Sequence, residues 1–120
     1  MVLADSSVWI DHFRSPQVQL LDLLAGGDLA IHPFVTGELA LGSVPDRANL
    51  LAFLATLPQV AAVDDALLLN FVRDNELYGC GVGLVDTHLL AAARVGTLCL
   101  WTRDKRLHVQ AEKLGLAYPA

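Results

Sequence analysis

Short apolar runs alternate along the chain with longer segments in which apolar residues recur at helical spacing. Four of the runs have the length and composition of buried strands, and they cover residues 1–4, 29–32, 60–63 and 97–101. The segments between them predict helices over residues 6–13, 16–25, 33–41, 46–57, 64–78, 84–95 and 104–114. Apolar strands alternating with helices are typical of βα units. The pattern therefore predicts an α/β fold with a central parallel sheet flanked by helices.

Polar and glycine residues between these segments predict where the helices begin. Ser6 or Ser7 is placed to cap the first helix, Pro16 lies near the first turn of the second, and Asp46 is placed to cap the fourth. A glycine-rich connection over residues 79–83 leads into the sixth helix. It lacks the complete glycine pattern of a dinucleotide-binding loop, so we interpret it as a flexible connection.

Length and composition limit the class of protein. A chain of 120 residues fits one domain, over residues 1–120, and its 54% hydrophobic content excludes intrinsic disorder. The longest uncharged stretch, residues 48–63, is shorter than the roughly 20 residues of a membrane span. The start of the chain also lacks the basic and apolar regions of a signal peptide, so we expect a cytoplasmic protein with no membrane partner. Cys80 and Cys99 lack metal-binding spacing and are expected to be buried free thiols.

The net charge of −5 argues against a nucleic-acid binder, because such proteins usually carry a basic surface. However, four of the 13 acidic residues lie in apolar surroundings, and these are Asp5, Glu38, Asp86 and Asp104. Asp5 and Asp104 each follow a predicted strand. The carboxyl ends of parallel strands share one edge of a sheet, where ligands bind, so we expect these two acids at the same edge.

The other two acids lie on the apolar faces of predicted helices. Glu38 shares its face with Phe34 and Leu41, and Asp86 shares its face with Leu89. A carboxylate on an apolar face is costly unless it is paired or binds a cation, and no basic residue lies in these segments. Any one of the four acids could alone be a helix cap or the partner of an arginine. Together they indicate a cation site.

A set of oxygen ligands without a histidine or cysteine pattern suits Mg²⁺, with Mn²⁺ as a substitute, rather than zinc. If the four acids form one site, they account for −4 of the net charge of −5. The acidity then belongs to a metal site and does not describe a surface that repels RNA.

Four motifs, in order along the chain, resemble those of the PIN-domain nucleases, and among these the VapC-type toxins of bacterial toxin–antitoxin pairs. The motifs are Asp5-Ser6-Ser7-Val8-Trp9-Ile10, Glu38-Leu39, Val85-Asp86 followed by Leu89-Leu90-Ala91-Ala92, and Leu100-Trp101-Thr102-Arg103-Asp104. Each motif is common by itself, whereas the ordered set is specific and covers essentially the whole chain.

The resemblance implies a PIN-like three-layer fold and a Mg²⁺-dependent endoribonuclease that is usually a homodimer and is inhibited by a cognate VapB-type antitoxin. In this chain the catalytic acids of the family fall on Asp5, Glu38, Asp86 and Asp104. Ser7 and Thr102 match positions where hydroxyl groups support the carboxylates. Many members carry another acid two residues after the last one, and here that position is Arg106.

Hydrolysis of a phosphodiester suggests a role for each group. We hypothesise that Asp5 and Asp86 bind the metal directly and that Asp104 completes the site, directly or through water. Glu38 would orient or deprotonate the attacking water. Three neighbouring basic residues are candidates for contacts to RNA phosphates, and these are Arg103, Lys105 and Arg106.

Two other functions stay open from the sequence. A non-catalytic PIN-like module would bind RNA or protein without cleaving it. A Mg²⁺-dependent phosphatase or phosphoryl-transfer domain would use a similar sheet edge, but Ser7 stands where an Asp-x-Asp motif requires a second acid. His88 is expected to point away from Asp86 on its helix, and Trp9 and Trp101 are expected in the core.

Overall fold

A three-stranded parallel sheet lies at the centre of the computed structural model, which describes residues 1–119. Strand β1 (Val2–Ala4) lies between β2 (Leu29–Ala30) and β3 (Cys99–Trp101). Both neighbours run parallel to β1. The carboxyl ends of the strands therefore meet at one edge of the sheet, as the alternating pattern predicts.

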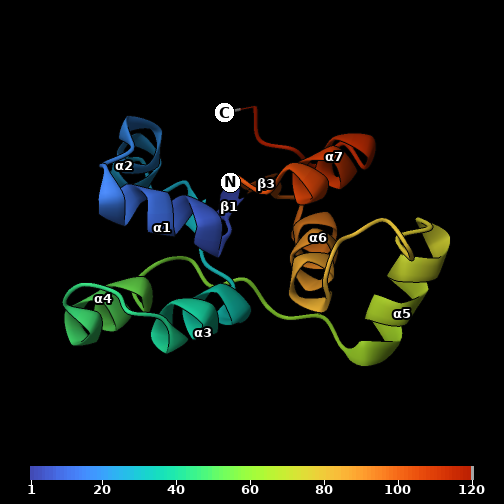
Figure 1. Cartoon of the computed structure of the whole chain (residues 1–120), viewed down its shortest axis with the longest axis horizontal. Coiled ribbons are helices and arrows are strands. Elements are labelled where there is room, and N and C mark those ends of the chain that lie inside the picture. Colours follow the sequence, from blue (N-terminus) through green and yellow to red (C-terminus); the bar gives the residue numbers. More distant parts are fainter. Residues whose placement is uncertain (120) are drawn as a thin grey trace.

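Helices cover both faces of this sheet (Figure 1). They are α1 (Ser6–Arg14), α2 (Val18–Ala25), α3 (Pro33–Leu41), α4 (Arg47–Leu54), α5 (Asp65–Asp74), α6 (Leu84–Gly96) and α7 (Lys105–Lys113). Figure 1 shows α1 and α2 on one side of the strands, α6 and α7 on the other, and α5 outermost beside α6. This arrangement confirms the predicted PIN-like three-layer α/β fold.

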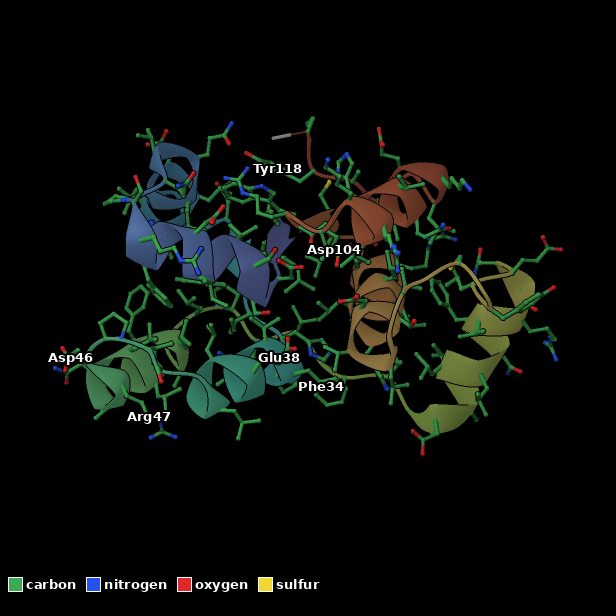
Figure 2. The ribbon with its side chains drawn as sticks, viewed as in Figure 1. Phe34, Glu38, Asp46, Arg47, Asp104 and Tyr118 are labelled. Carbon is green, nitrogen blue, oxygen red and sulfur yellow. The ribbon has the colours of Figure 1, made fainter. Side chains whose placement is uncertain are left out.

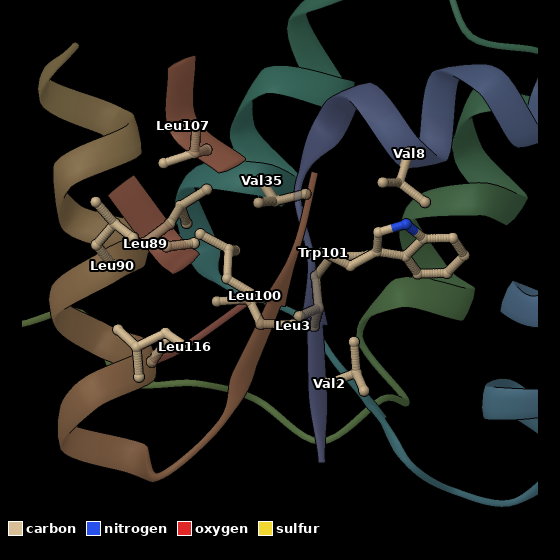
Figure 3. Close-up of a cluster of buried hydrophobic side chains, with 14 of the residues drawn as sticks. Val2, Leu3, Val8, Val35, Leu89, Leu90, Leu100, Trp101, Leu107 and Leu116 are labelled. Carbon is tan, nitrogen blue, oxygen red and sulfur yellow. The ribbon is translucent and has the colours of Figure 1, made fainter. Parts of the chain in front are cut away.

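The core is built on alternate residues of the strands, which point to opposite faces of the sheet. Leu3 and Leu100 are paired residues of neighbouring strands. They lie on the face of the sheet that packs against Leu89 of α6 (Figure 3). Trp101 lies on the opposite side, toward α1. Trp9 and Trp101 are each only 2% exposed, which confirms their predicted place in the core.

The predicted strand over residues 60–63 is wrong. Gln59 forms an isolated parallel bridge to Ile31, and Ala61 and Ala62 just beyond it are exposed. A strand added to a parallel sheet would be covered on both faces. The fold leaves these residues uncovered, so they continue as a connection to α5.

The starts of the first two helices also differ from the prediction. Asp5, not Ser6 or Ser7, caps α1 with its side chain, because its carboxylate accepts the free backbone N–H groups of the first turn. Helix α2 begins at Val18 and not at Pro16, because the residue before the helix has extended backbone angles.

Two further helix boundaries differ from the prediction. Asp46 precedes α4 with a left-handed backbone (φ 48°), and its carboxylate accepts a hydrogen bond from the side chain of Asn49 in place of a backbone N–H. Helix α5 ends at Asp74 and does not reach Tyr78, because Glu76 takes a left-handed conformation with φ 52°.

Two expectations from composition can be compared with the structure. Cys80 and Cys99 are free thiols as predicted, although each is half-buried and not fully buried. None of the helices within residues 1–119 has the length and apolar character needed to cross a bilayer.

Candidate active site

Asp5 follows β1 and is the most deeply buried acid of the predicted quartet, with 5% of its surface exposed. One carboxylate oxygen accepts hydrogen bonds from the backbone N–H and the hydroxyl of Ser7, at 3.0 and 2.5 Å, and from the backbone N–H of Val8. The other accepts the hydroxyl of Thr102, at 2.5 Å. Burial raises the pKa of Asp5, and these hydrogen bonds partly oppose the rise. Both hydroxyls that the motifs indicate as supporting groups therefore contact the same carboxylate.

Thr102 connects Asp5 to the next acid. It follows β3, and its hydroxyl accepts the backbone N–H of Asp104 at 3.0 Å. One carboxylate oxygen of Asp104 accepts the backbone N–H groups of Arg106 and Leu107 and so caps α7. The other carboxylate oxygen of Asp104 accepts no hydrogen bond within residues 1–119. The structure confirms that Asp5 and Asp104 lie at one edge of the sheet.

Asp86 lies in the first turn of α6 and is half-buried. Burial raises the pKa of its carboxyl group, the negative charges of Asp104, Asp5 and Glu38 raise it further, and a hydrogen bond from the backbone of Gly83 opposes the rise. Three acids from distant parts of the chain are therefore close enough to Asp86 to repel its negative charge.

Glu38 joins this cluster from α3. Its carboxylate accepts a hydrogen bond from the hydroxyl of Ser6 at 3.2 Å, and Figure 2 shows Glu38 and Asp104 directed toward the same central region. The expectation that Glu38 lies on a buried apolar stripe is wrong, because Glu38 is exposed and Leu41 is 91% exposed. Helix α3 buries a different side, so this acid reaches the site from the solvent-facing surface.

The chemistry of the cluster fits a divalent cation. Among the residues that the structure describes, none of these four acids forms an ion pair with a basic side chain. Carboxylate and hydroxyl oxygens are the donors that Mg²⁺ and Mn²⁺ prefer. No three His, Cys, Asp or Glu side chains in residues 1–119 are already arranged around one point as a metal site. Neutralisation of the repelling carboxylates is the reason to expect a cation there.

The three basic residues after Thr102 lie in different surroundings. The guanidinium group of Arg103 binds Asp11 at 3.1 Å and Gln17 at 2.9 Å and lies over the ring of Trp101. Asp11 is therefore half of a partly exposed ion pair. Lys105 lines an open hollow of about 410 Å³ together with Arg103.

Arg106 extends in another direction, across the glycine-rich loop before α6. A Cβ atom added to Gly81 would lie 2.9 Å from the Cδ atom of Arg106, and Gly81 has a φ of 87°. The side chain of Arg106 therefore packs directly on the backbone at Gly81. Any side chain at position 81 would collide with it. This places its charge beside the loop that leads to Asp86.

Two contacts near the site were not predicted from the sequence. Ser6, interpreted only as a possible cap, donates to Glu38. His88 is 6% exposed, and its ring contacts Phe34 of α3 with ring centroids 4.7 Å apart. Both contacts depend on how α3 packs against its neighbours, which the sequence does not show. The hydroxyl of Ser6, next to Asp5, is the one feature of the sequence that could have indicated a polar contact.

No family model matches the chain. The chain is 43% identical over 118 residues to Ribonuclease VapC32 of Mycobacterium tuberculosis, in the CDC 1551 / Oshkosh and the ATCC 25618 / H37Rv strains. The match covers 98% of this chain and 95% of the relative.

Three solved structures are similar to the fold. PAE2754 from Pyrobaculum aerophilum aligns with a TM-score of 0.60 at 19% identity, over 94% of this chain and 92% of that one. FitAcB from Neisseria gonorrhoeae aligns with a TM-score of 0.62 at 21% identity, over 93% and 94%. FitAB bound to the IR36 DNA fragment aligns with a TM-score of 0.61 at 21% identity, over 93% and 91%.

The structural similarities support the fold, and the 43% identity along nearly the whole chain establishes the family. The prediction from the four ordered motifs is confirmed: the chain belongs to the VapC ribonucleases.

Proposed function

We propose that this chain is a Mg²⁺-dependent endoribonuclease toxin that hydrolyses RNA phosphodiester bonds at its cluster of four carboxylates. The observation that carries the proposal is the position of Asp86, whose pKa is raised by burial and by the charges of Asp104, Asp5 and Glu38. This repulsion is costly in the free protein, and a bound cation would relieve it. The identity to Ribonuclease VapC32 supports RNA as the substrate.

Asp5 and Asp86 would hold the cation, Mg²⁺ or Mn²⁺ as a substitute, and Asp104 would complete the site with its free carboxylate oxygen. When bound, the cation would polarise the phosphate and make a water molecule more acidic. The hydroxyls of Ser7 and Thr102 fix the orientation of Asp5, since both donate to its carboxylate.

Glu38 would position the attacking water and accept its proton. It is exposed, so water and substrate can reach it. Ser6 donates to one of its carboxylate oxygens, and the other oxygen can accept the proton of the water. A carboxylate held in this way can act as a general base if the water lies within hydrogen-bonding distance.

Basic side chains beside the cluster would bind the phosphates of the RNA strand. Lys105 is exposed and forms no ion pair within residues 1–119, and Arg106 lies over Gly81. Arg103 is already paired with Asp11, so its contribution to RNA binding would require that this ion pair be shared or exchanged.

The proposed partners are a cognate VapB-type antitoxin and a second copy of this chain, in the cytoplasm. A hollow of about 340 Å³ between α1 and the end of α3 has an apolar lining that includes Ile10, Phe13 and Leu39. Glu38 lies in the same lining. An apolar antitoxin segment in this hollow would therefore cover one of the catalytic acids.

The proposal is tested by incubating the purified chain with RNA in Mg²⁺, in EDTA, and in EDTA followed by excess Mg²⁺. Cleavage should require the metal and should disappear in Asp86→Asn. Asp74→Asn is the matched control, because Asp74 is exposed on α5 and, within residues 1–119, forms an ion pair only with Arg73. RNA binding without cleavage would support the non-catalytic module, and hydrolysis of a phosphomonoester but not of RNA would support the phosphatase.

A further inference from the structure

Phe34 is an aromatic residue exposed beside the acidic cluster. It lies in the first turn of α3, four residues before Glu38, and 36% of its surface is exposed. Residues four apart lie on the same face of a helix. Figure 2 shows Phe34 and Glu38 next to each other at the end of α3 that faces α6.

The ring of Phe34 also connects two of the elements that carry catalytic acids. Its centroid lies 4.7 Å from that of His88, two residues beyond Asp86 on α6, with the rings 72° apart. Phe34 thus lies where α3, which carries Glu38, meets α6, which carries Asp86. A molecule bound at the carboxylates would pass beside this ring.

Two buried histidines fix the orientation of Phe34. The ring of His32 lies 5.0 Å from that of Phe34 at an angle of 70°, and His32 is fully buried. Its Nδ1 atom also accepts the backbone N–H of Phe34 at 3.0 Å. Edge-to-face contacts on two sides, together with this backbone hydrogen bond, hold the ring in one place although part of it faces solvent.

Other exposed aromatic residues lie farther from the cluster. Tyr78 is 67% exposed in the loop after α5, and Phe53 is 43% exposed on α4. Neither element contributes an acid to the cluster. Phe34 is the exposed aromatic side chain that shares a helix face with one of the carboxylates.

We propose that Phe34 is a platform for a nucleobase: it stacks the base next to the phosphate that the carboxylates cleave. The inference rests on the proposed ribonuclease function. A cation held by the acids would bind the phosphate, and the ring supplies the apolar, flat surface that a base requires. Stacking on an aromatic ring tolerates any base, because every base has a π face. The ring itself carries no charge, so it would bind the base and not the phosphate backbone of the strand.

The test compares Phe34→Leu, which keeps an apolar side chain but removes the ring, with Phe34→Trp, which keeps a ring. With a short RNA of defined cleavage site, kcat/KM should fall about 5- to 150-fold in Phe34→Leu, the range that one base–aromatic stack contributes. Phe34→Trp should retain most of the activity. Phe53→Ala is the control for loss of an exposed aromatic residue, and a thermal melt of each variant checks its fold.

The substrate can be changed as well as the protein. An abasic site next to the scissile bond should lower kcat/KM of the wild type by the same factor as Phe34→Leu, and it should cause no further loss in that variant. Equal activity of wild type and Phe34→Leu on the intact RNA, or equal losses on the abasic RNA, would contradict the inference.

A measurement without cleavage separates this inference from the proposed function. In an Asp86→Asn background, RNA that carries 2-aminopurine at the same position should lose fluorescence on binding, because stacking quenches this base. Adding Phe34→Leu should restore the fluorescence. If the wild-type chain cleaves no RNA but the quenching depends on Phe34, the platform stands and the proposed function fails. Quenching that is unchanged by Phe34→Leu overturns the platform.

Discussion

Asp5 and Asp86 have the same side chain and lie in one cluster, but the fold treats them differently. Asp5 follows a strand and accepts hydrogen bonds from Ser7, Val8 and Thr102. Asp86 begins a helix, and burial, followed by the charges of Asp104, Asp5 and Glu38, raises its pKa. Burial raises the pKa of both carboxyl groups, but hydrogen bonds from the protein oppose the rise at Asp5, whereas neighbouring negative charges add to it at Asp86.

The difference separates two roles within one site. A carboxylate whose donors all come from the protein is positioned before any ligand arrives. A carboxylate that is buried and repelled, with a single backbone hydrogen bond to oppose the repulsion, is only partly compensated until a cation is present. Substitution of the first should reduce both stability and activity, and substitution of the second should reduce activity alone.

The largest effect is expected for Asp86→Asn. Because stabilisation of phosphate charge by a metal is worth several kcal/mol, RNA cleavage should fall by about three orders of magnitude or more. In the absence of metal the melting temperature should rise, because the neutral amide is not repelled by Asp104, Asp5 and Glu38. A lower melting temperature for this variant in EDTA would contradict the comparison.

Asp5→Asn should have the opposite effect on stability. Its amide nitrogen cannot accept a hydrogen bond, so a buried donor among Ser7, Val8 and Thr102 loses its partner. The expected loss in the free energy of unfolding is about 1–3 kcal/mol. Thr102→Val, which keeps the shape of the side chain, should cause part of the same loss, and Thr102→Ser should restore it. Urea unfolding measures all three variants, and unchanged stability in both Asp5→Asn and Thr102→Val would remove the structural role of Asp5.

A third prediction concerns the pH dependence of the α3 side of the site. Burial, and to a smaller extent the charge of His88, lowers the pKa of His32 to about 4. Between this value and the ordinary value of 6.5, the unfolded chain binds a proton that the folded chain does not. His32 therefore makes the protein lose about 2 kcal/mol of stability between roughly pH 7 and pH 5. His32→Asn, which keeps a side-chain acceptor for capping, should remove that part of the pH dependence. An identical loss in wild type and variant would contradict the buried neutral histidine.

The smallest effect is expected for the basic residues beside the acidic cluster, which belong neither to the surroundings of Asp5 nor to those of Asp86. Lys105→Gln with Arg106→Gln should weaken RNA binding and reduce the slope of log affinity against log salt by about one for each phosphate that the variant no longer binds. Arg73→Gln is the control, because Arg73 is exposed on α5 and pairs with Asp74. An unchanged slope would show that neither residue contacts phosphate.

The sequence predicts the layers of the fold better than its boundaries. Burial on both faces makes β1 and β3 continuous apolar runs, and this signal is local. The run at residues 60–63 is equally apolar, but whether it joins the sheet depends on what covers it, and the fold leaves Ala61 and Ala62 exposed. Asp46 likewise precedes a helix as predicted, but its left-handed backbone directs its carboxylate to Asn49.

The site is predictable from the sequence to a similar degree. The rule that residues following parallel strands meet at one edge of the sheet correctly predicts that Asp5 and Asp104 lie together. The apolar stripe that indicates Glu38 in the sequence is absent from the structure, and Glu38 joins the cluster from an exposed surface. The contacts of Ser6 with Glu38 and of Phe34 with His88 could not be predicted, because each joins segments whose packing no local pattern describes.

The four carboxylates should form one cation site whose repulsion is relieved on binding. Thermal unfolding of the wild type and Asp86→Asn at neutral pH, in EDTA and in increasing Mg²⁺, tests this claim most directly. We expect Mg²⁺ to raise the melting temperature of the wild type, by the equivalent of about 2.7 kcal/mol at roughly one hundred times the dissociation constant. Asp86→Asn should start higher in EDTA and respond little. A wild type that is insensitive to both Mg²⁺ and Mn²⁺, or an equal response of the two proteins, would contradict the claim.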